Sequence, residues 1–223
     1  MLQWTSWQHR LKKWGWDTDE STRPLETPRG RWMKISSYTV VLDACVLFPA
    51  PLRDLLIELA ASGLFRAKWS ERIQQEWIDS LLKKRPDLDP KAIARTKQLM
   101  ETAVPDCLVS GYEDIEKALA LPDPGDNHIL AAAIKAKAAG IITTNLKHFP
   151  KDKLDQYDVE AQHPDEFIHH QFGLNTASVL IAVQRCRARL KAPPMNPEEY
   201  LVCLQAQGLP LTVEMLWPYS AVI

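Results

Sequence analysis

The sequence predicts an α/β protein built on a parallel sheet, with a small helical region toward its C-terminus. Three observations lead to this fold class. From residue 38 onwards, short apolar runs rich in β-branched residues alternate with longer segments of helical periodicity. Strands joined through helices pair in parallel with right-handed crossovers. Beyond about residue 155 the apolar runs give way to short helices separated by prolines.

The elements of the sheet follow one another in a regular order. The candidate strands are "YTVVL" (38–42), "LFRAKWS" (64–70), "VPDCLVSG" (104–111), "IITT" (141–144) and "YDVEA" (157–161). Helices are predicted between them over residues 51–63, 71–84, 91–103 and 126–140. Pro51 suits a first helical turn, Ser70 and Asp126 suit N-caps, and Gly140 marks a helix end.

Three regions are expected along the chain: residues 1–32, 33–155 and 156–223. The last is predicted to hold helices over 163–173, 176–192, 197–208 and 211–217. These helices carry too many apolar side chains to stand in water, so we expect the region to dock on the main domain or on a second copy. The side chains concerned are Phe167, Phe172, Leu180, Val183, Leu190, Leu201, Leu204 and Leu216.

Residues 1–32 are expected to form a poorly structured arm, and four tryptophans crowd its start. Met33 opens "MKISSYTVVLD", which resembles a natural domain start. One interpretation is that the upstream segment comes from an early start codon or a cloning choice. The other is an aromatic arm that binds a partner. Both remain open.

Composition narrows the class of protein. The net charge of −1 gives no global positive field for nucleic acid, although a local basic patch can exist within that balance. The four cysteines have no metal-ligand spacing and are interpreted as reduced thiols. With no apolar run long enough for a membrane span and no signal-peptide core, a soluble cytoplasmic protein is expected.

Acidic and amide residues follow the predicted strands. Asp43 closes the first strand and Asn145 the fourth, while Asp123 and Asp126 lie in the loop before a helix and Glu76 lies in the helix after the second strand. The carboxyl ends of parallel strands share one edge of the sheet, so these groups can converge. Clustered carboxylates need a cation, and a divalent metal there would suit water attack on a phosphodiester.

Each of these residues also has an ordinary structural interpretation. Asp43 can be a turn or cap residue, Asp126 an N-cap and Asp123 a turn residue. Glu76 can be a solvated helix residue and Thr143 a plain strand residue. His128 and His148 are interpreted as surface or supporting residues rather than ligands.

The order of three motifs resembles the PIN-domain family, in particular the VapC-like toxins of toxin–antitoxin pairs. The motifs are "VVLDACVLFP", Glu76 in "SERIQQEWIDSL", and "DPGDNHILAAAIKAKAAGIITTNLKHFP", and the match spans about residues 38–150. The resemblance implies a PIN-type three-layer α/β/α fold over residues 33–155 and a Mg²⁺- or Mn²⁺-dependent ribonuclease. "HPDEFI" is similar to the start of the helical C-terminal extension of one subgroup, and a cognate antitoxin is implied as partner.

The resemblance also implies roles for single residues. Asp43, Glu76 and Asp126 correspond to the catalytic and metal-binding acids, Thr143 to a supporting hydroxyl and Asn145 to the fourth metal-binding position. This sequence departs from the pattern at that fourth position, which is often Asp. It also has His148 and Cys45 where the family often has an acid and Asn. Asp123 can compensate for the missing charge, and the second metal site is the more affected.

Two basic stretches are candidates for RNA contact or, alternatively, solvated helix faces. They are residues 83–97 and the group Arg185, Arg187, Arg189 and Lys191. A phosphatase of the haloacid-dehalogenase type and a receiver domain are weaker alternatives, because Cys45 replaces the required second Asp and no Lys follows the "IITTN" strand. A PIN-like module that binds RNA or protein without cleavage is the main rival. A homodimer is a further expectation.

Overall fold

The computed structural model describes residues 38–191 and 193–223. The arm predicted over residues 1–32 lies outside the described residues, as does Met33. Within the described part, none of the helices has the length and hydrophobicity needed to cross a membrane.

The centre of the molecule is a five-stranded sheet in which every pairing is parallel, and its strand order is β3-β2-β1-β4-β5. The strands are β1 (Thr39–Leu42), β2 (Arg66–Ser70), β3 (Leu108–Val109), β4 (Gly140–Ile142) and β5 (Glu160–Gln162). The predicted parallel sheet is confirmed. Every residue of β1 is buried, as expected for a strand covered on both faces.

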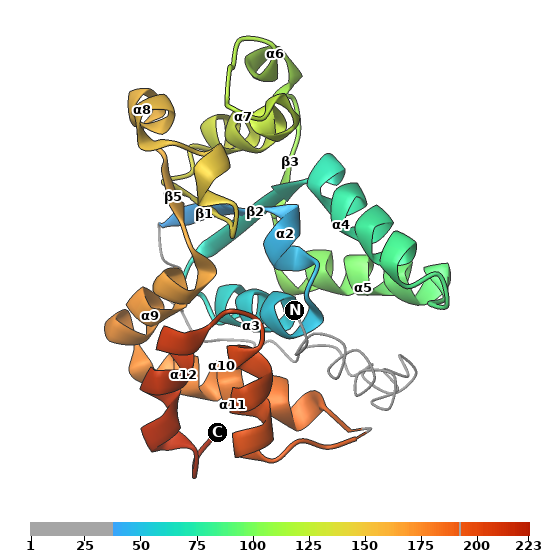
Figure 1. Ribbon diagram of the computed structural model, residues 1–223, viewed down its shortest axis with the longest axis vertical. Helices are drawn as coiled ribbons and strands as arrows, with labels where there is room; N and C mark the ends of the chain where they lie inside the picture. Colours follow the sequence, from blue (N-terminus) through green and yellow to red (C-terminus); the bar gives the residue numbers. More distant parts are fainter. Residues whose placement is uncertain (1–37, 192) are drawn as a thin grey trace.

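Helices cover both faces of the sheet and give three layers (Figure 1). Helix α7 (Asn127–Ala136) and the short α6 (Glu113–Glu116) lie on one side, and α3 (Ala50–Ala61) and α5 (Pro90–Ala103) lie on the other. Helix α4 (Glu71–Lys84) flanks the sheet and is capped by Ser70, whose Oγ accepts a hydrogen bond from the Ile73 amide at 3.2 Å. The predicted α/β/α fold class is therefore confirmed.

The sheet continues past residue 155, where the predicted main domain ends. The chain passes through α8 (Lys151–Leu154) and a 3₁₀ turn (Asp155–Tyr157) and then forms β5, which pairs with β4. This edge strand is only partly buried and has a mixed sequence, "EAQ", so it lacks the apolar signal of the central strands. The sheet thus extends to Gln162, and the helical region begins after it.

The C-terminal region consists of α9 (Pro164–Leu174), α10 (Thr176–Arg189), α11 (Pro197–Gln205), α12 (Pro210–Leu216) and a 3₁₀ turn (Trp217–Tyr219). Helix α10 packs against α3 of the main domain. The ring of Phe167 meets the ring of Phe65 edge-on, with centroids 4.8 Å apart. The region therefore docks on its own main domain, the first of the two predicted arrangements.

A buried carboxylate reinforces this docking. Glu58 on α3 is 1% exposed, and its Oε2 lies 2.7 Å from Arg189 and its Oε1 3.3 Å from Arg185, both on α10. Arg187 donates to the backbone carbonyls of Met195 and Ile223. These guanidinium groups hold α10 to α3 and to the chain end.

These intramolecular contacts bear on the prediction that Arg185, Arg187, Arg189 and Lys191 contact RNA. The three arginines already serve the packing of the helical region, whereas Lys191 is exposed beyond the end of α10. A role in RNA binding stays a prediction. Charge reversal at the arginines would disturb docking as well as any RNA surface, so it does not isolate RNA binding.

Candidate functional site

The site lies at the carboxyl ends of β1 and β4, where neighbouring strands lead the chain to opposite sides of the sheet. Asp43 follows β1, and Thr143 follows β4 directly. Such a switch point is where parallel α/β folds place their functional groups.

Asp43 ends the strand because it caps a helix. The apolar residues after it form the short helix α2 (Ala44–Leu47), whose Val46 and Leu47 are buried, and Asp43 is its N-cap. The Asp43 carboxylate accepts a weak hydrogen bond of 3.4 Å from the Cys45 amide. Apolar residues can thus stand on both sides of Asp43, because the backbone changes from strand to helix at that residue.

The buried Asp43 carboxylate is held by side-chain donors. The hydroxyl of Thr143 donates to its Oδ2 at 2.6 Å, and the Cys45 thiol donates to the same oxygen at 3.0 Å. Burial, together with the charge of Asp43, raises the pKa of the Cys45 thiol to about 12, so the thiol remains a donor at neutral pH. These donors offset the cost of burying an ionised group that is 5% exposed.

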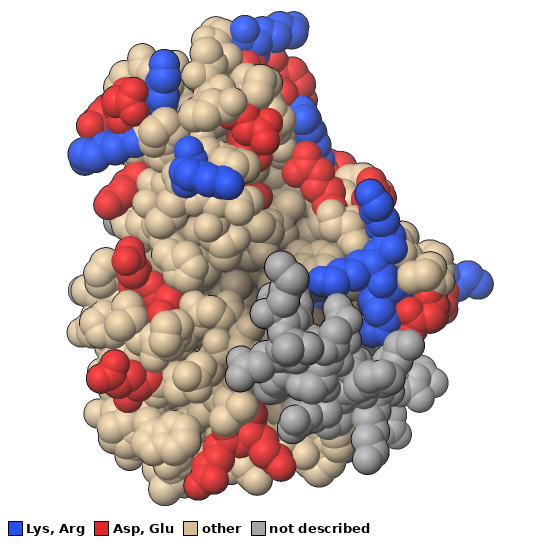
Figure 2. Space-filling model, viewed as in Figure 1, with Lys and Arg blue, Asp and Glu red and all other residues tan. Residues whose placement is uncertain are grey.

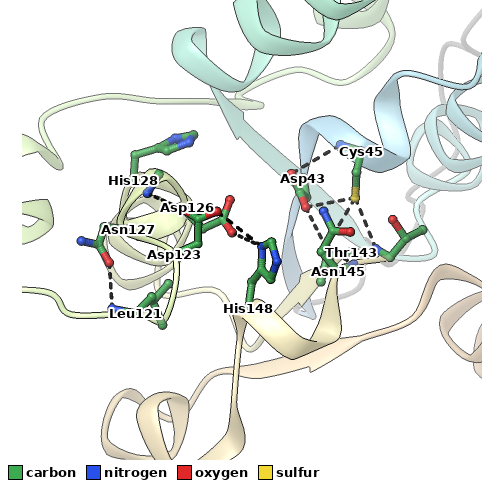
Figure 3. A network of polar contacts seen from close by, with 12 residues as sticks. Asp43, Cys45, Leu121, Asp123, Asp126, Asn127, His128, Thr143, Asn145 and His148 are labelled. Atoms are coloured by element: carbon green, nitrogen blue, oxygen red, sulfur yellow. Dashed lines mark hydrogen bonds and ion pairs between the residues drawn. The ribbon is translucent and has the colours of Figure 1, made fainter.

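Facing Asp43 is a second group made of Asp123, Asp126 and His148 (Figure 3). Asp126 stands at the N-terminus of α7 but makes no side-chain cap hydrogen bond; its Oδ2 lies 2.7 Å from Nδ1 of His148 instead. Asp123 accepts from the Gly125 amide at 2.9 Å, and its other oxygen is 3.9 Å from the same His148 nitrogen. The N-cap interpretation of Asp126 is therefore incomplete, since its carboxylate points to the histidine.

Electrostatics connect the two groups. Partial burial is the largest cause that raises the pKa of Asp126, and the charges of Asp43 and Asp123 raise it further, while the hydrogen bond from His148 lowers it. The charges of Asp43 and Asp126 therefore repel each other. Carboxylates in this relation favour a bound cation, because it removes their mutual repulsion.

The donor set fits a divalent cation. The ligand atoms of Asp123, Asp126 and His148 all lie within 4.8 Å of one another. Carboxylate oxygens suit Mg²⁺ and Mn²⁺, and an imidazole nitrogen suits transition metals. The group can accordingly hold one metal ion.

Glu76 approaches from the other side of α7. Its Oε1 lies 3.1 Å from Nε2 of His128, the residue two positions after Asp126, and 3.3 Å from Nε of Arg72. Arg72 in turn binds Glu116 at 2.8 Å. Glu76 is thus paired with His128 and Arg72 and does not share the donors of Asp43. Its predicted catalytic role stays a prediction.

The segment after β4 wraps around the Asp43 network. The backbone amide of Asn145 donates to the Thr143 hydroxyl oxygen at 3.0 Å, and the backbone amide of Thr144 donates to the Cys45 sulfur at 3.3 Å. The following 3₁₀ turn (Leu146–His148) carries His148 to Asp126. Thr143 donates to Asp43, and its predicted supporting role stays a prediction, as does metal binding through the side-chain amide of Asn145.

Sequence reasoning missed two contributors. His148 was interpreted as a supporting or surface residue, yet it makes the shortest contact to Asp126. Cys45 appeared only as a departure from a family pattern, yet it donates to Asp43. The signal for His148 was its position in "TTNLKHF", where the resembled family often has an acid.

Comparison with known proteins identifies two adjoining families. The family model described as a PIN domain matches residues 39–147, and the model described as the VapC50 C-terminal domain matches residues 164–217. The second match begins just after β5, in agreement with the observed end of the sheet. No solved structure matches the chain significantly.

One relative among curated proteins supports the same assignment. A protein named "Putative ribonuclease VapC50" from Mycobacterium tuberculosis (strain ATCC 25618 / H37Rv) is 37% identical over 97 residues, which are 44% of this chain. The chain spans 57% of the length of that relative. Fold, motif order and both family matches agree: residues 39–147 form a PIN domain, and residues 164–217 form a C-terminal domain of the VapC50 type.

Proposed function

We propose that the chain is a metal-dependent endoribonuclease that acts in the cytoplasm as the toxin of a toxin–antitoxin pair. The observation that supports this is the group of Asp123, Asp126 and His148, whose ligand atoms lie within 4.8 Å of one another, together with the charge of Asp43, which raises the pKa of Asp126. The printed name of the relative, a ribonuclease, supports the same activity. The phosphatase and receiver alternatives have no support from the family matches.

The proposed roles follow from the contacts. Thr143 and Cys45 fix the Asp43 carboxylate on its Oδ2 side and leave Oδ1 with the weak Cys45 amide contact. Asp43, Asp126 and Asp123 would hold Mg²⁺ or Mn²⁺, with Asn145 offering its amide oxygen. When bound, such an ion supplies a water of lowered pKa and stabilises charge on the phosphate.

Glu76 is proposed as the remaining acid of the site. His128 is 1% exposed and contacts the Glu76 carboxylate through Nε2. The solvent-exposed Arg72 contacts the same carboxylate from the surface of the protein. The buried His128 therefore fixes Glu76 relative to α7, which also carries Asp126. The Glu76 carboxylate is thus held by His128 and Arg72 and not by the donors of Asp43.

RNA is the proposed substrate, and the surface offers a basic region for it. Figure 2 shows Lys and Arg side chains gathered over α4 and α5, within the stretch 83–97 predicted from sequence. Several of these cations have acidic partners, such as Arg85 with Asp87 and Lys97 with Glu71. A moderate cationic surface beside the site suits single-stranded loops, whose bases are accessible.

Metal removal tests the activity. Protein stripped of metal with EDTA should cut RNA at no more than about a hundredth of the rate with Mg²⁺ or Mn²⁺, because the water is not activated without the ion. Readdition of either ion should restore cleavage, measured as end-labelled fragments on a gel. Equal cleavage with and without EDTA would contradict the metal mechanism. Metal-dependent RNA binding without cleavage would instead favour the non-cleaving PIN-like module.

A partner protein is the second part of the proposal. A cognate antitoxin would place a cationic side chain against Asp43 or Asp126, where an Arg can bind a carboxylate through two hydrogen bonds. Expression of the chain alone should arrest growth of its host, and co-expression with the partner should restore growth. Normal growth with soluble, RNA-cleaving and unpartnered protein would contradict the toxin role and leave the nuclease intact.

A further inference from the structure

We infer that His148 is a direct metal ligand through Nδ1 and that it makes the site select Mn²⁺ and similar transition-metal ions over Mg²⁺. The inference rests on the metal site of the proposed function and adds the class of ion that this site prefers. Three observations carry it: the direction of the His148 ring, the spacing of the donor atoms and the charge of the site.

The ring of His148 points its Nδ1 at both aspartates. This nitrogen lies 2.7 Å from Asp126 Oδ2 and 3.9 Å from Asp123 Oδ2. A neutral imidazole carries its proton on only one nitrogen, so Nδ1 can offer a lone pair when the proton is on Nε2. The nitrogen therefore stands where either a hydrogen bond to Asp126 or a shared metal ion can form.

The spacing agrees with a shared ion. Metal–ligand bonds of about 2.1 Å separate neighbouring ligands of an octahedral ion by about 3 Å and opposite ones by about 4 Å. The three donor atoms lie within 4.8 Å of one another. Small rotations of Asp126 and Asp123 are enough to close this group on one ion.

The charge of the site favours a softer ion than Mg²⁺. Asn145 and His148 bring no negative charge when neutral, and the Asp43 Oδ2 is occupied by the Thr143 and Cys45 donors. Mg²⁺ binds hard oxygen ligands and gains little from an imidazole, whereas affinity for nitrogen-containing sites rises through the first-row transition metals. Exchange of a carboxylate for an imidazole thus weakens Mg²⁺ binding more than Mn²⁺ binding.

The test measures metal binding itself, without RNA. Metal-free full-length protein is titrated with Mn²⁺ while free Mn²⁺ is followed by electron paramagnetic resonance, and Mg²⁺ affinity is obtained by competition. The wild-type protein should bind Mn²⁺ at least about tenfold more tightly than Mg²⁺. The variant His148→Asp should reduce this preference about tenfold, while His169→Asp, an exposed histidine on α9, serves as the matched control and should not change it.

A spectroscopic signature separates a ligand from a positioning residue. Electron spin echo modulation from bound Mn²⁺ should show coupling to a ¹⁴N nucleus in the wild-type protein and in His169→Asp, and the coupling should disappear in His148→Asp. Bound Mn²⁺ without nitrogen coupling in the wild-type protein would overturn the inference. An unchanged Mn²⁺ to Mg²⁺ ratio in His148→Asp would do the same.

The outcome is separable from that of the proposed function. Nitrogen coupling and Mn²⁺ selectivity in a protein that cuts no RNA would uphold the metal assignment and remove the nuclease. Metal-dependent cleavage by a protein whose bound Mn²⁺ shows no nitrogen coupling would uphold the nuclease and remove the assignment. If His148→Asp binds no metal, the wild-type spectrum alone decides.

Discussion

Asp43→Asn should lower RNA cleavage by at least about a hundredfold while the protein stays folded. The substitution removes the charge that faces Asp126 but keeps an oxygen that can accept from the Thr143 hydroxyl. Loss of that charge also lowers the repulsion on Asp126, so its pKa should fall toward the ordinary range. The melting temperature of the metal-free protein should be unchanged or higher. Initial cleavage rates and thermal unfolding check these expectations.

A matched control variant distinguishes the loss of a site residue from the loss of any one negative charge. Asp155→Asn makes the same change of charge in an exposed 3₁₀ turn, where Asp155 pairs with Lys151. Its cleavage rate should equal that of the wild-type protein. Cleavage by Asp43→Asn at the wild-type rate would place the active site elsewhere in the chain.

Deletion of residues 163–223 should remove most of the stability of the PIN domain. Helix α3 has buried side chains on nearly all of its faces, since it packs on the sheet on one side and on α10 on the other. The deletion exposes apolar side chains including Phe65, at about 2 kcal/mol for each large one. A domain has only about 5–15 kcal/mol of stability. The shortened chain should aggregate or melt at least about 10 °C lower.

A milder variant separates apolar packing from the ion pairs. Glu58→Gln in the full chain keeps the shape of the contact but removes the charge that Arg185 and Arg189 share. Both arginines are partly exposed, so the expected loss is about 1–2 kcal/mol, well below that of the deletion. A monomeric shortened chain with cooperative unfolding at the wild-type temperature would show that the PIN domain folds without its extension.

The sheet was predictable because its central strands carry their signal locally. β1 and β4 are buried apolar runs, and Ser70 and Pro90 mark the starts of α4 and α5. Helix α2 was not predicted, because four residues are too few to show helical periodicity. β5 lies at an edge and lacks the apolar pattern of the central strands, so the strand predicted over residues 157–161 was left outside the main domain predicted to end at residue 155.

The site was predictable only in part, for a different reason. The acids could be named from their order and from the family resemblance, but their pairings depend on long-range contacts. Glu58 is hidden in the apolar "LLIEL" run, and nothing local indicates partners on α10, more than a hundred residues later. In the same way, no local pattern shows that His128 binds Glu76 while His148 binds Asp126.

The central position of β1 has a consequence for how the protein is made. β1 is the first of the described strands to leave the ribosome, yet one of its two neighbours, β4, follows only after β2, β3 and their helices. A nascent chain therefore keeps one edge of β1 unpaired until the second half of the sheet emerges. Asp43 belongs to the first half, and Asp126 and His148 to the second. Under the proposed function, the acidic groups of the site would come together only after the second half of the sheet has emerged, so a shorter nascent chain would lack the complete nuclease site.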